Sequence, residues 1–485
     1  MRRAFSPRVL GPAVALALVT LDGGRLIGTN EGSTQAVSSS TAQPRGAITL
    51  FDGRVIPAMP KLLSVREQYE LRLKWLEKKH ATLLPMMRKY GIGMWIIVNE
   101  EFHNDPVTEY VVPNLVYVSR RDVIAFIDGG PDGLKSFSNY WRPTADYARF
   151  IESFPGARTT DRGPDLAAGL KAVFEKYQPK TIALNMGGRR GQDSGLTYDS
   201  YNFLVETLGP DAQKRFVSAA LLIEDYFDTR LADELEYYRD AVLVTDILAQ
   251  RALSNEVITP GKTRAADIKW FYHQQIASLG VGAEPWFEVH IAVQRYDPQT
   301  GKTIPYVHPA PDDLVIQRGD IIHLDCGFNY LGFATDWQKV GYVLRPGETD
   351  VSPGMKTALR NGNITQDAIN KTARPGMTGR EATIAAIKQL EGVDFLPSLY
   401  SHAIGYQGHA VGPGINARNM VLGPAPARDS VLRLGSYRSI ELSATTAIPE
   451  WKGEKLLIPF EDDAYLTENG YEWFRPPQTK WYLIK

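Results

Sequence analysis

Two aspartates near the middle of the chain have a spacing that points to chemistry. Asp325 lies in the β-rich run 320–328 and Asp336 in the run 333–344, and the segment 329–332 between them is typical of a hairpin turn. The two positions are equally far from the centre of that turn, so we expect them to face each other on one side of the hairpin. Opposed like charges repel, and two such carboxylates therefore require a cation between them or a shared proton.

A second acidic pair lies near the C-terminal end of the sequence. Glu441 is in the strand-like run 437–447 and Glu461 in the run 456–466, and the midpoint between them falls inside the loop 449–453. Both glutamates have apolar neighbours, where an unpaired charge would be costly. Taken alone, Glu461 with its two following aspartates would usually be a solvated acidic patch. Together, the two hairpins predict two opposed acidic pairs.

Histidine and cysteine limit what else could bind a cation. His402 and His409 lie seven residues apart in a Gly-rich segment, which allows the backbone to approach a ligand closely, and His308 precedes the first acidic hairpin. Any of the three could instead be a structural histidine with one hydrogen bond. Cys326 is the only cysteine and should point into the core, opposite to Asp325. A metal site in this chain must therefore use carboxylates and imidazoles.

The elements around these residues suggest two domains. Strands alternate with helices from about 61 to 225, which indicates an α/β domain whose first helix begins at the capping box Ser64-x-x-Glu67. The remainder, 226–485, carries the candidate site. We therefore expect a smaller α/β domain followed by a larger α+β domain.

A short repeat in the larger domain indicates internal symmetry. Pro-Gly-Lys-Thr at 260–263 recurs as Pro-Gly-Met-Thr at 375–378, and each time a helix precedes the turn and a second helix follows it. Each threonine, Thr263 and Thr378, stands where a helix N-cap belongs. Two α-α-β halves related by a pseudo-twofold axis would place a site where they meet. The alternative is that Pro-Gly-x-Thr is an ordinary turn between two helices and implies no symmetry.

The N-terminal residues predict export. Arg2 and Arg3 precede an apolar run, 9–21, which is too short to span a bilayer as a helix, and a Ser/Thr-rich stretch follows. We interpret 1–36 as a signal peptide with its leader and 37–60 as a linker. The protein is then expected to be periplasmic or secreted, with no stable membrane span after signal removal. The alternative is a disordered N-terminal tail.

The bulk charge argues against one class of partner. Lys plus Arg number 54 and Asp plus Glu number 55, so the chain has no basic excess with which to bind nucleic acid.

At this point the ordered set of acidic residues and histidines resembles a known family. Asp325, a second Asp eleven residues later, then His402, Glu441 and Glu461 resemble the M24 metallopeptidases with the pita-bread fold, such as methionine aminopeptidase, aminopeptidase P and prolidase. The motifs that carry the resemblance are Asp325-Cys326-Gly327, Ala334-Thr335-Asp336, His402-Ala403-Ile404-Gly405 and Phe460-Glu461-Asp462-Asp463. His308, 17 residues before Asp325, resembles the family's substrate-facing histidine, and His409 its second histidine. The match covers about 228–475.

The resemblance implies a fold and a pair of metals. The fold would be a pita-bread catalytic domain after a creatinase-like N-terminal domain. Asp336 and Glu461 would bridge two divalent cations, with Asp325 completing one shell and His402 with Glu441 the other. Such ligands suit Mn²⁺, our first expectation, as well as Co²⁺ or Zn²⁺.

It also implies roles for the remaining residues and for the substrate. Glu441 would act as general base, while His308 and His409 would donate to the carbonyl oxygen or the tetrahedral intermediate. The substrate would be a peptide with proline second, which loses its N-terminal residue. An Xaa-Pro dipeptide is the alternative, and relatives are commonly homodimers.

Two departures from the family pattern keep other hypotheses open. Leu442 follows the first glutamate, where aminopeptidase P and prolidase usually have proline, and Pro459 stands where they often have arginine, two residues before Glu461. The lost arginine removes a charge partner of that carboxylate. The competing hypotheses are a metal-free creatinase-like enzyme and a non-catalytic binding protein.

Overall fold

The computed structural model describes residues 46–485 except 115, 119, 157, 161–162, 281 and 426–429. The expected signal peptide and leader, 1–36, lie outside the described residues, as does the first part of the expected linker, 37–45. Within the described chain, no helix has both the length and the apolar character that a membrane span requires. The strands β1 (Ile48–Thr49) and β2 (Val55–Ile56) form a short antiparallel pair at its start.

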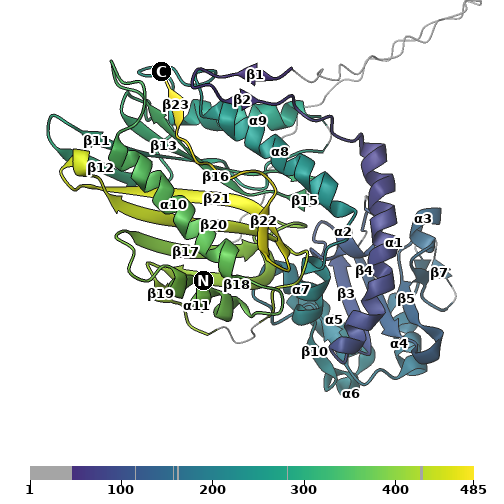
Figure 1. The fold of residues 1–485 in the computed structure, drawn as a ribbon. Coiled ribbons are helices and arrows are strands. Elements are labelled where there is room, and N and C mark those ends of the chain that lie inside the picture. Colours follow the sequence, from purple (N-terminus) through teal and green to yellow (C-terminus); the bar gives the residue numbers. More distant parts are fainter. Residues whose placement is uncertain are drawn as a thin grey trace, which may run out of the picture. The chain divides into compact units, whose positions relative to one another are not determined.

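The first of two main sheets has six strands and mixed pairing, in the order β10-β9-β3-β4-β5-β6 (Figure 1). β3 pairs in parallel with β9 and antiparallel with β4, and helices are interleaved with the strands along the chain. The long first helix begins at Ser64, whose hydroxyl and Glu67 form the expected capping box. The strands are β3 (Met94–Glu100), β4 (Arg121–Asp128), β5 (Leu134–Ser138), β6 (Glu152–Ser153), β9 (Ile182–Leu184) and β10 (Phe216–Ser218), beside a two-stranded pair, β7 (Arg158–Thr160) and β8 (Gly163–Pro164). The helices are α1 (Val65–Lys89), α2 (Thr108–Val111), η1 (Gly130–Asp132), α3 (Ala145–Ala148), α4 (Leu166–Tyr177), η2 (Gly191–Asp193), α5 (Tyr198–Leu208), α6 (Pro210–Gln213) and α7 (Ala220–Asp228).

The second main sheet is larger and carries the candidate site. Its strands run in the order β12-β11-β13-β16-β21-β20-β17-β18-β19, with β22 paired to β21 and β23 to β16. The strands are β11 (His290–Asp297), β12 (Lys302–Val307), β13 (Asp320–Cys326), β16 (Trp337–Val343), β17 (Leu396–Ala403), β18 (Ala410–Arg418), β19 (Val421–Leu422), β20 (Tyr437–Ala447), β21 (Lys455–Thr467), β22 (Gly470–Trp473) and β23 (Tyr482–Ile484), with the small pair β14 (Asn329–Tyr330) and β15 (Phe333–Ala334). The helices are α8 (Glu234–Ala252), α9 (Ala265–Ser278), α10 (Pro353–Thr372), α11 (Gly379–Gln389) and η3 (Pro449–Trp451).

The strand order of this sheet shows the expected pseudo-twofold symmetry. Two helices, α8 and α9, precede the group β11-β12-β13-β16, and α10 with α11 precede β17-β18-β20-β21. In each group the first strand lies between the second and the third, and the fourth strands, β16 and β21, pair with each other at the centre of the sheet. This arrangement of two α-α-β halves after a smaller α/β region confirms the predicted pita-bread fold class.

The repeated Pro-Gly-x-Thr turn marks equivalent points in the two halves, although one detail of the prediction was wrong. Gly261 and Gly376 both have positive φ, and their N–H groups donate to the carbonyls of Ile316 and Leu432 respectively. Thr378 caps α11 as expected. In the first half, however, α9 is capped at Arg264, because the Thr263 hydroxyl bonds to the Val257 carbonyl and accepts from Thr259 N–H instead.

The four long helices of the second region cover one face of its sheet. Asn361 and Gln366 of α10 reach the sheet through Thr446 Oγ1 (2.9 Å) and Asp462 Oδ2 (2.9 Å). Lys339 Nζ bonds to Asp462 on that face. Side chains alternate along a strand, so Gln338 and Glu461, next to these residues, point to the face away from α10.

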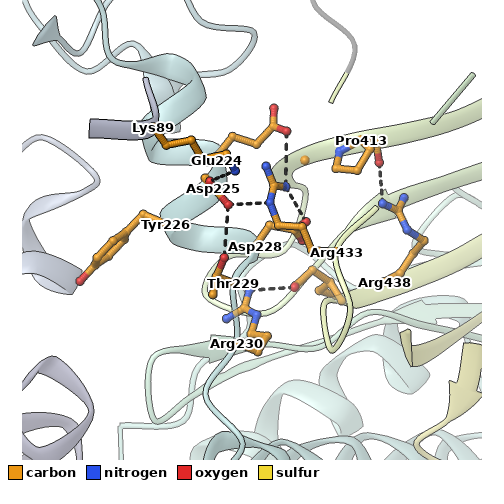
Figure 2. A network of polar contacts seen from close by, with 12 residues as sticks. Lys89, Glu224, Asp225, Tyr226, Asp228, Thr229, Arg230, Pro413, Arg433 and Arg438 are labelled. Carbon is orange, nitrogen blue, oxygen red and sulfur yellow. Dashed lines mark hydrogen bonds and ion pairs between the residues drawn. The ribbon is translucent and has the colours of Figure 1, made fainter. Parts of the chain in front are cut away.

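A buried polar network ties α7 to the loop before β20. Figure 2 shows the guanidinium of Arg433 pointing into three carboxylates of α7: Nε donates to Asp225 (2.7 Å), Nη1 to Asp228 (2.9 Å), and Glu224 lies 3.7 Å from Nη1. Lys89 Nζ adds a second cation, 2.6 Å from Asp225. Here a protein cation neutralises each buried acid.

Candidate metal centre

The five residues predicted to bind metal come from five separate segments and meet on the sheet face opposite α10. Asp336, His402 and Glu461 are buried, while Asp325 and Glu441 are half-buried. Asp336 lies in the two-residue link between β15 and β16; the others belong to β13 (Asp325), β17 (His402), β20 (Glu441) and β21 (Glu461).

The first acidic hairpin has a different register from the one we expected. The turn residues Leu331 and Gly332 both have positive φ, 57° and 79°, as a two-residue type I′ turn requires. The hairpin is therefore centred one residue later than predicted, and Asp325 faces Gln338 rather than Asp336. A two-residue register change leaves each side chain on its face because the period of a strand is two. Asp325 and Asp336 consequently still converge.

The second hairpin has the predicted register. Glu441 and Glu461 are direct partners on β20 and β21. Glu461 in turn faces Gln338 on β16, and Gln338 faces Asp325 on β13. The pairing continues from Asp325 to His290 on β11. A single row of polar side chains therefore crosses five neighbouring strands through the middle of the sheet.

Ligand atoms of these residues cluster closely enough to hold cations. Asp325, Asp336 and Glu461 form one group, and His402, Glu441 and Glu461 a second, with the donor atoms of each group within 4.8 Å of one another. Glu461 belongs to both. Asp336 joins a further group with His402 and His409. Two carboxylates thus stand between two sets of donors, which is the arrangement that a pair of metals needs.

The carboxylates of this cluster lack a protein cation. Among the described residues, no Lys or Arg forms an ion pair with any of them; their only ion-pair partners are histidines. Burial and the neighbouring charges raise the pKa of Glu441 to about 8 and that of Glu461 to about 8. The same causes raise the pKa of Asp336 well above its ordinary value. The cluster is therefore arranged to bind positive charge from outside the chain.

His402 has the protonation state of a metal ligand. Its Nδ1 donates to its neighbour's carbonyl oxygen, on Ala403 (2.9 Å), so Nε2 carries the lone pair. Nε2 has no hydrogen-bond partner among the described residues and lies 3.5 Å from Glu461, 3.7 Å from Asp336 and 3.9 Å from Glu441. Burial lowers the pKa of His402 to about 3, so the ring is neutral. A buried lone pair aimed at three carboxylates fits a divalent cation.

Neutral hydrogen-bond donors hold Glu461 where the family often has arginine. The Ser439 hydroxyl bonds to Oε1, and the Gln338 amide donates to Oε2 (2.8 Å). Pro459 pairs with Ser443 on the neighbouring strand. The charge partner that Pro459 removes is thus replaced by two donors that orient the carboxylate without neutralising it.

Gln338 is itself oriented by a chain of hydrogen bonds. Since its amide nitrogen donates to Glu461, its oxygen must accept from His323 Nε2 (2.9 Å). His323 Nδ1 then accepts from the Tyr306 hydroxyl (2.8 Å). Burial lowers the pKa of His323 to about 4, which keeps the ring in this neutral form. Tyr306, His323 and Gln338 therefore fix the direction of one Glu461 oxygen.

His308 and His409 lie at the rim of the cluster, where both are exposed. His409 Nε2 is 3.9 Å from Asp336, and the ring lies edge-on to Trp286 with centroids 5.4 Å apart. Burial and His402 lower the pKa of His409 to about 4, and burial with the charge of His290 lowers the pKa of His308. Both rings are thus neutral near pH 7 and present N–H donors.

A cleft of about 630 Å³ opens beside His409. Arg190 and Gln192, from the first region of the chain, line it together with Trp286, Asn329 and His409. Gln192 donates to the His409 carbonyl (3.0 Å). The first region therefore supplies part of the approach to the carboxylate cluster.

Four residues around the cluster were missing from the prediction, and a simple rule would have found three of them. His323 and Ser439 each lie two residues from a candidate ligand on the same strand, and Gln338 lies two residues after Asp336, which directly precedes its strand, so all three must point to the ligands' face. His290 has no such signal, because it is adjacent to Asp325 only through strand pairing.

Comparison with known proteins finds a matching family model and a curated relative. The sequence model described as "Metallopeptidase family M24" matches residues 236–468. A curated relative, an uncharacterized peptidase YqhT of Bacillus subtilis (strain 168), is 23% identical over 280 residues, which are 56% of this chain and 68% of that protein.

Solved structures share the fold at low sequence identity. An X-Pro aminopeptidase from Thermotoga maritima MSB8 is 19% identical with a TM-score of 0.57, over 82% of this chain and 100% of that one. An Xaa-Pro dipeptidase from Bacillus anthracis is 18% identical with a TM-score of 0.58, over 84% of this chain and 100% of that one. A dipeptidase PepE from Mycobacterium ulcerans is 15% identical with a TM-score of 0.58, over 85% and 99%.

Proposed function

Because residues 236–468 are a metallopeptidase domain of family M24, we propose that this protein is a dinuclear-metal Xaa-Pro aminopeptidase, which removes the N-terminal residue before proline. The observation that carries the proposal is the convergence of four carboxylates and the free Nε2 of His402 in two groups of donor atoms that share Glu461. Asp336 and Glu461 would bridge the two cations, Asp325 would complete one shell, and His402 with Glu441 the other. The oxygen-rich donor set favours Mn²⁺, with Co²⁺ or Zn²⁺ as alternatives.

The bound cations would supply Lewis-acid activation of water and of the scissile carbonyl. The chain's own residues would manage protons and orientation. Glu441 is half-buried, and bound cations would keep it ionised, so it could take a proton from the attacking water and pass it to the leaving amine. Ser439 and Gln338 hold Glu461 in place while this occurs.

His308 and His409 would stabilise the substrate's oxygen. Both are exposed next to the carboxylates, and both are neutral near pH 7 because their pKa values are lowered. A neutral imidazole N–H can donate to the carbonyl oxygen as negative charge develops on it. Trp286, which packs edge-on against His409, would keep that ring facing the cleft.

A second candidate function is that of an Xaa-Pro dipeptidase. The dipeptidase from Bacillus anthracis and the aminopeptidase from Thermotoga maritima match this chain with TM-scores of 0.58 and 0.57, so the fold does not separate the two activities. The open cleft beside His409 would have room for a peptide longer than a dipeptide, which favours the aminopeptidase over the dipeptidase.

The test uses purified protein with Mn²⁺, Co²⁺ or Zn²⁺ and a panel of Xaa-Pro dipeptides and longer Xaa-Pro peptides. Release of the N-terminal residue from longer peptides is expected, with about two metal ions per chain by elemental analysis. Cleavage of dipeptides alone would indicate the dipeptidase. Absence of bound metal and of cleavage would support a metal-free creatinase-like enzyme or a binding protein.

Export remains part of the proposal. Arg2, Arg3 and the following apolar run support a cleaved signal, which would place the mature enzyme in the periplasm or outside the cell. Mass spectrometry of the N-terminus from fractionated cells tests this. A mature chain that retains residues 1–36 in the cytoplasm would contradict it.

A further inference from the structure

One segment beside the metal centre departs from the regular pairing of its sheet. β17 and β18 pair in register as far as Ser401 and Ile415. Beyond that point only Ala403 and Ala410 are partners. The segment 404–414 therefore has few main-chain bonds to β17. Most of its residues are buried, so its carbonyl groups need other hydrogen-bond donors.

Side chains supply those donors, and several of them come from the first region of the chain, 61–225. The carbonyl oxygens accept from Arg230 Nη2 at Ile404 (3.1 Å), the Tyr110 hydroxyl at Tyr406, Gln192 Nε2 at His409 (3.0 Å), Arg189 Nη2 at Gly412 (2.8 Å) and Arg438 Nη2 at Pro413 (2.6 Å; Figure 2). Tyr110, Arg189 and Gln192 belong to the first region. The segment that carries His409 is thus held by a part of the protein that precedes the larger domain.

The loop after β9, which carries two of these donors, is braced by its own hydrogen bonds. Asp193 is buried and accepts from the Arg189 N–H (3.1 Å), and the Ser194 hydroxyl accepts from the Gly188 N–H (2.8 Å). No side chain would fit at Gly188, because a Cβ there would lie 2.1 Å from the carboxyl carbon of Asp193. The Arg189 guanidinium is also paired with Glu224 (2.8 Å). The loop therefore presents its donors at a fixed position.

Tyr110 reaches the same segment from α2. Its ring is stacked on that of Tyr406, with centroids 4.7 Å apart and an interplanar angle of 25°, and its hydroxyl donates to the Tyr406 carbonyl. The Tyr226 hydroxyl donates in turn to the Tyr110 carbonyl (2.7 Å). The first region therefore holds the segment on both sides of its middle, through Tyr110 before His409 and through Gln192 at His409 itself.

The direction of the His409 ring depends on this support. The side chain is 48% exposed, and its ring contacts His402 and Trp286 edge-on, with centroids 4.5 Å and 5.4 Å away. Half of the ring surface is thus free of protein contacts. The position of the main chain at residue 409, where Gln192 binds, consequently has a large share in placing the ring beside the carboxylate cluster.

We propose that Gln192, Arg189 and Tyr110 are positioning residues, which hold the main chain around His409 so that its ring faces the carboxylate cluster. The consequence for catalysis rests on the proposed function, in which His409 donates to the substrate's oxygen. The hold on the main chain does not rest on it. The first region would then be a working part of the active site and not only a neighbouring domain.

The first experiment measures amide hydrogen exchange of the segment 404–413 in the full-length protein with Mn²⁺. Gln192→Met, Arg189→Met and Tyr110→Phe each remove one donor and keep a side chain of similar size. Each should make the segment exchange about fivefold faster, as the loss of one net hydrogen bond implies. Gln213→Met, at an exposed glutamine of α6, is the matched control and should exchange like the wild type. Unchanged exchange in all three variants would overturn the proposal.

The second experiment measures Xaa-Pro cleavage. A misplaced donor weakens stabilisation of the transition state more than substrate binding, so Gln192→Met should lower kcat about tenfold while KM, Mn²⁺ affinity and melting temperature stay unchanged. The double variant Gln192→Met/His409→Ala should be no slower than His409→Ala, because Gln192 acts through His409. Losses that multiply independently would overturn the positioning role, since they are expected if Gln192 only stabilises the fold.

Together the two experiments separate this inference from the proposed function. A wild-type protein that cleaves no Xaa-Pro peptide would contradict the proposed function, while faster exchange in Gln192→Met and Arg189→Met would still support the hold on the segment. An active wild type whose variants exchange and cleave at the wild-type rate would overturn only the positioning role.

Discussion

Two groups of buried carboxylates in this molecule are balanced in opposite ways. Around Arg433, three acids of α7 meet a guanidinium, and Lys89 adds a second cation (Figure 2). Burial raises the pKa of Asp225, but the Lys89 hydrogen bond and the Arg433 charge outweigh it, so the pKa lies below its ordinary value. In the metal centre, burial and mutual repulsion raise the pKa values of Glu441 and Glu461 to about 8.

The difference shows what each cluster is for. Carboxylates that pair with a Lys or Arg of the chain need no ion from solution, and here they link α7 to the loop before β20. Carboxylates without one remain unfavourable until a cation arrives from solution. Both clusters gather several carboxylates that are buried or half-buried, so the absence of a protein cation distinguishes the metal centre.

The strongest way to test this comparison is the same substitution in both clusters. Asp336→Asn should remove metal binding and reduce Xaa-Pro cleavage by about 10³-fold or more, because several kcal/mol of transition-state stabilisation is lost. The metal-free variant should be at least as stable as metal-free wild type, since one repelling charge is gone. Elemental analysis, peptidase kinetics and thermal unfolding measure these effects.

Asp228→Asn is the matched control. It removes a hydrogen-bonded acid beside Arg433, so it should cost about 1–3 kcal/mol of stability while metal content stays at the wild-type level. If the two Asp→Asn variants instead lost metal equally, the distinction between the clusters would be wrong.

The next largest effect is expected from removing the built-in counter-ion. Arg433→Met removes a cation that three buried carboxylates share and leaves Asp228 without an ion-pair partner among the described residues, so it should lower the free energy of unfolding by about 3–5 kcal/mol. The loss should be the same with and without added metal, because no metal site is involved. Denaturant unfolding measures it. Full rescue of this variant by Mn²⁺ would show that the clusters are not independent.

The metal centre should also make stability depend on pH in a characteristic direction. The folded-state pKa of Glu461, about 8, lies above the unfolded value of about 4.3, so the folded metal-free protein binds the extra proton between these values. Its stability therefore falls as pH rises from about 4 to 8. Bound cations favour the ionised form and should abolish the fall.

Thermal unfolding between pH 5 and 8, with chelator and with Mn²⁺, checks this prediction. In the Arg433 cluster the pH dependence of stability has the opposite sign. The pKa of Asp225 is lowered, so this residue contributes stability above its unfolded pKa of about 3.9, and the contribution is lost on acidification. A chelated protein whose melting temperature stays constant or rises toward pH 8 would contradict the assignment.

The smallest effect should come from removing one of the neutral hydrogen-bond donors around Glu461, and it should appear in the affinity for metal. Ser439→Ala removes one hydrogen bond to the carboxylate and should weaken metal affinity about tenfold, as loss of an orienting partner does. Ser443→Ala, on the same strand, makes no contact with Glu461 among the hydrogen bonds of the described residues and serves as control. Calorimetric titration with Mn²⁺ compares them. Equal affinities would show that Ser439 does not orient the ligand.

The sequence predicted the ligand types and the strands that carry them because both depend on local patterns, while the resemblance to the family implied the pita-bread fold class. Alternating strands indicated Glu441 and Glu461 as partners, and β20 covers the predicted range 437–447. The first hairpin was displaced by one residue at its turn because Leu331, a residue that disfavours positive φ, occupies a position where glycine or asparagine would signal a type I′ turn. Even so, period two kept Asp325 and Asp336 on one face.

Other features of the site could not be predicted from local pattern. The pairing of His290 with Asp325 depends on how β11 aligns with β13, and no tight turn between these two strands lets that register be predicted from the sequence. The orientation of Gln338 depends on Tyr306 and His323, which are brought together by the packing of β12 and β13 around β11. Such contacts join residues that are far apart along the chain.

By itself, the sequence determined which side chains could bind cations and which face of each strand would carry them, because residue type and a period of two are local properties. Only the tertiary structure decided that the strands align into one polar row, that no Lys or Arg of the described residues pairs with its carboxylates, and that His290 joins His308 beside Asp325. Charge balance and strand register are settled by which distant segments come into contact, so neither can be known before the chain is folded.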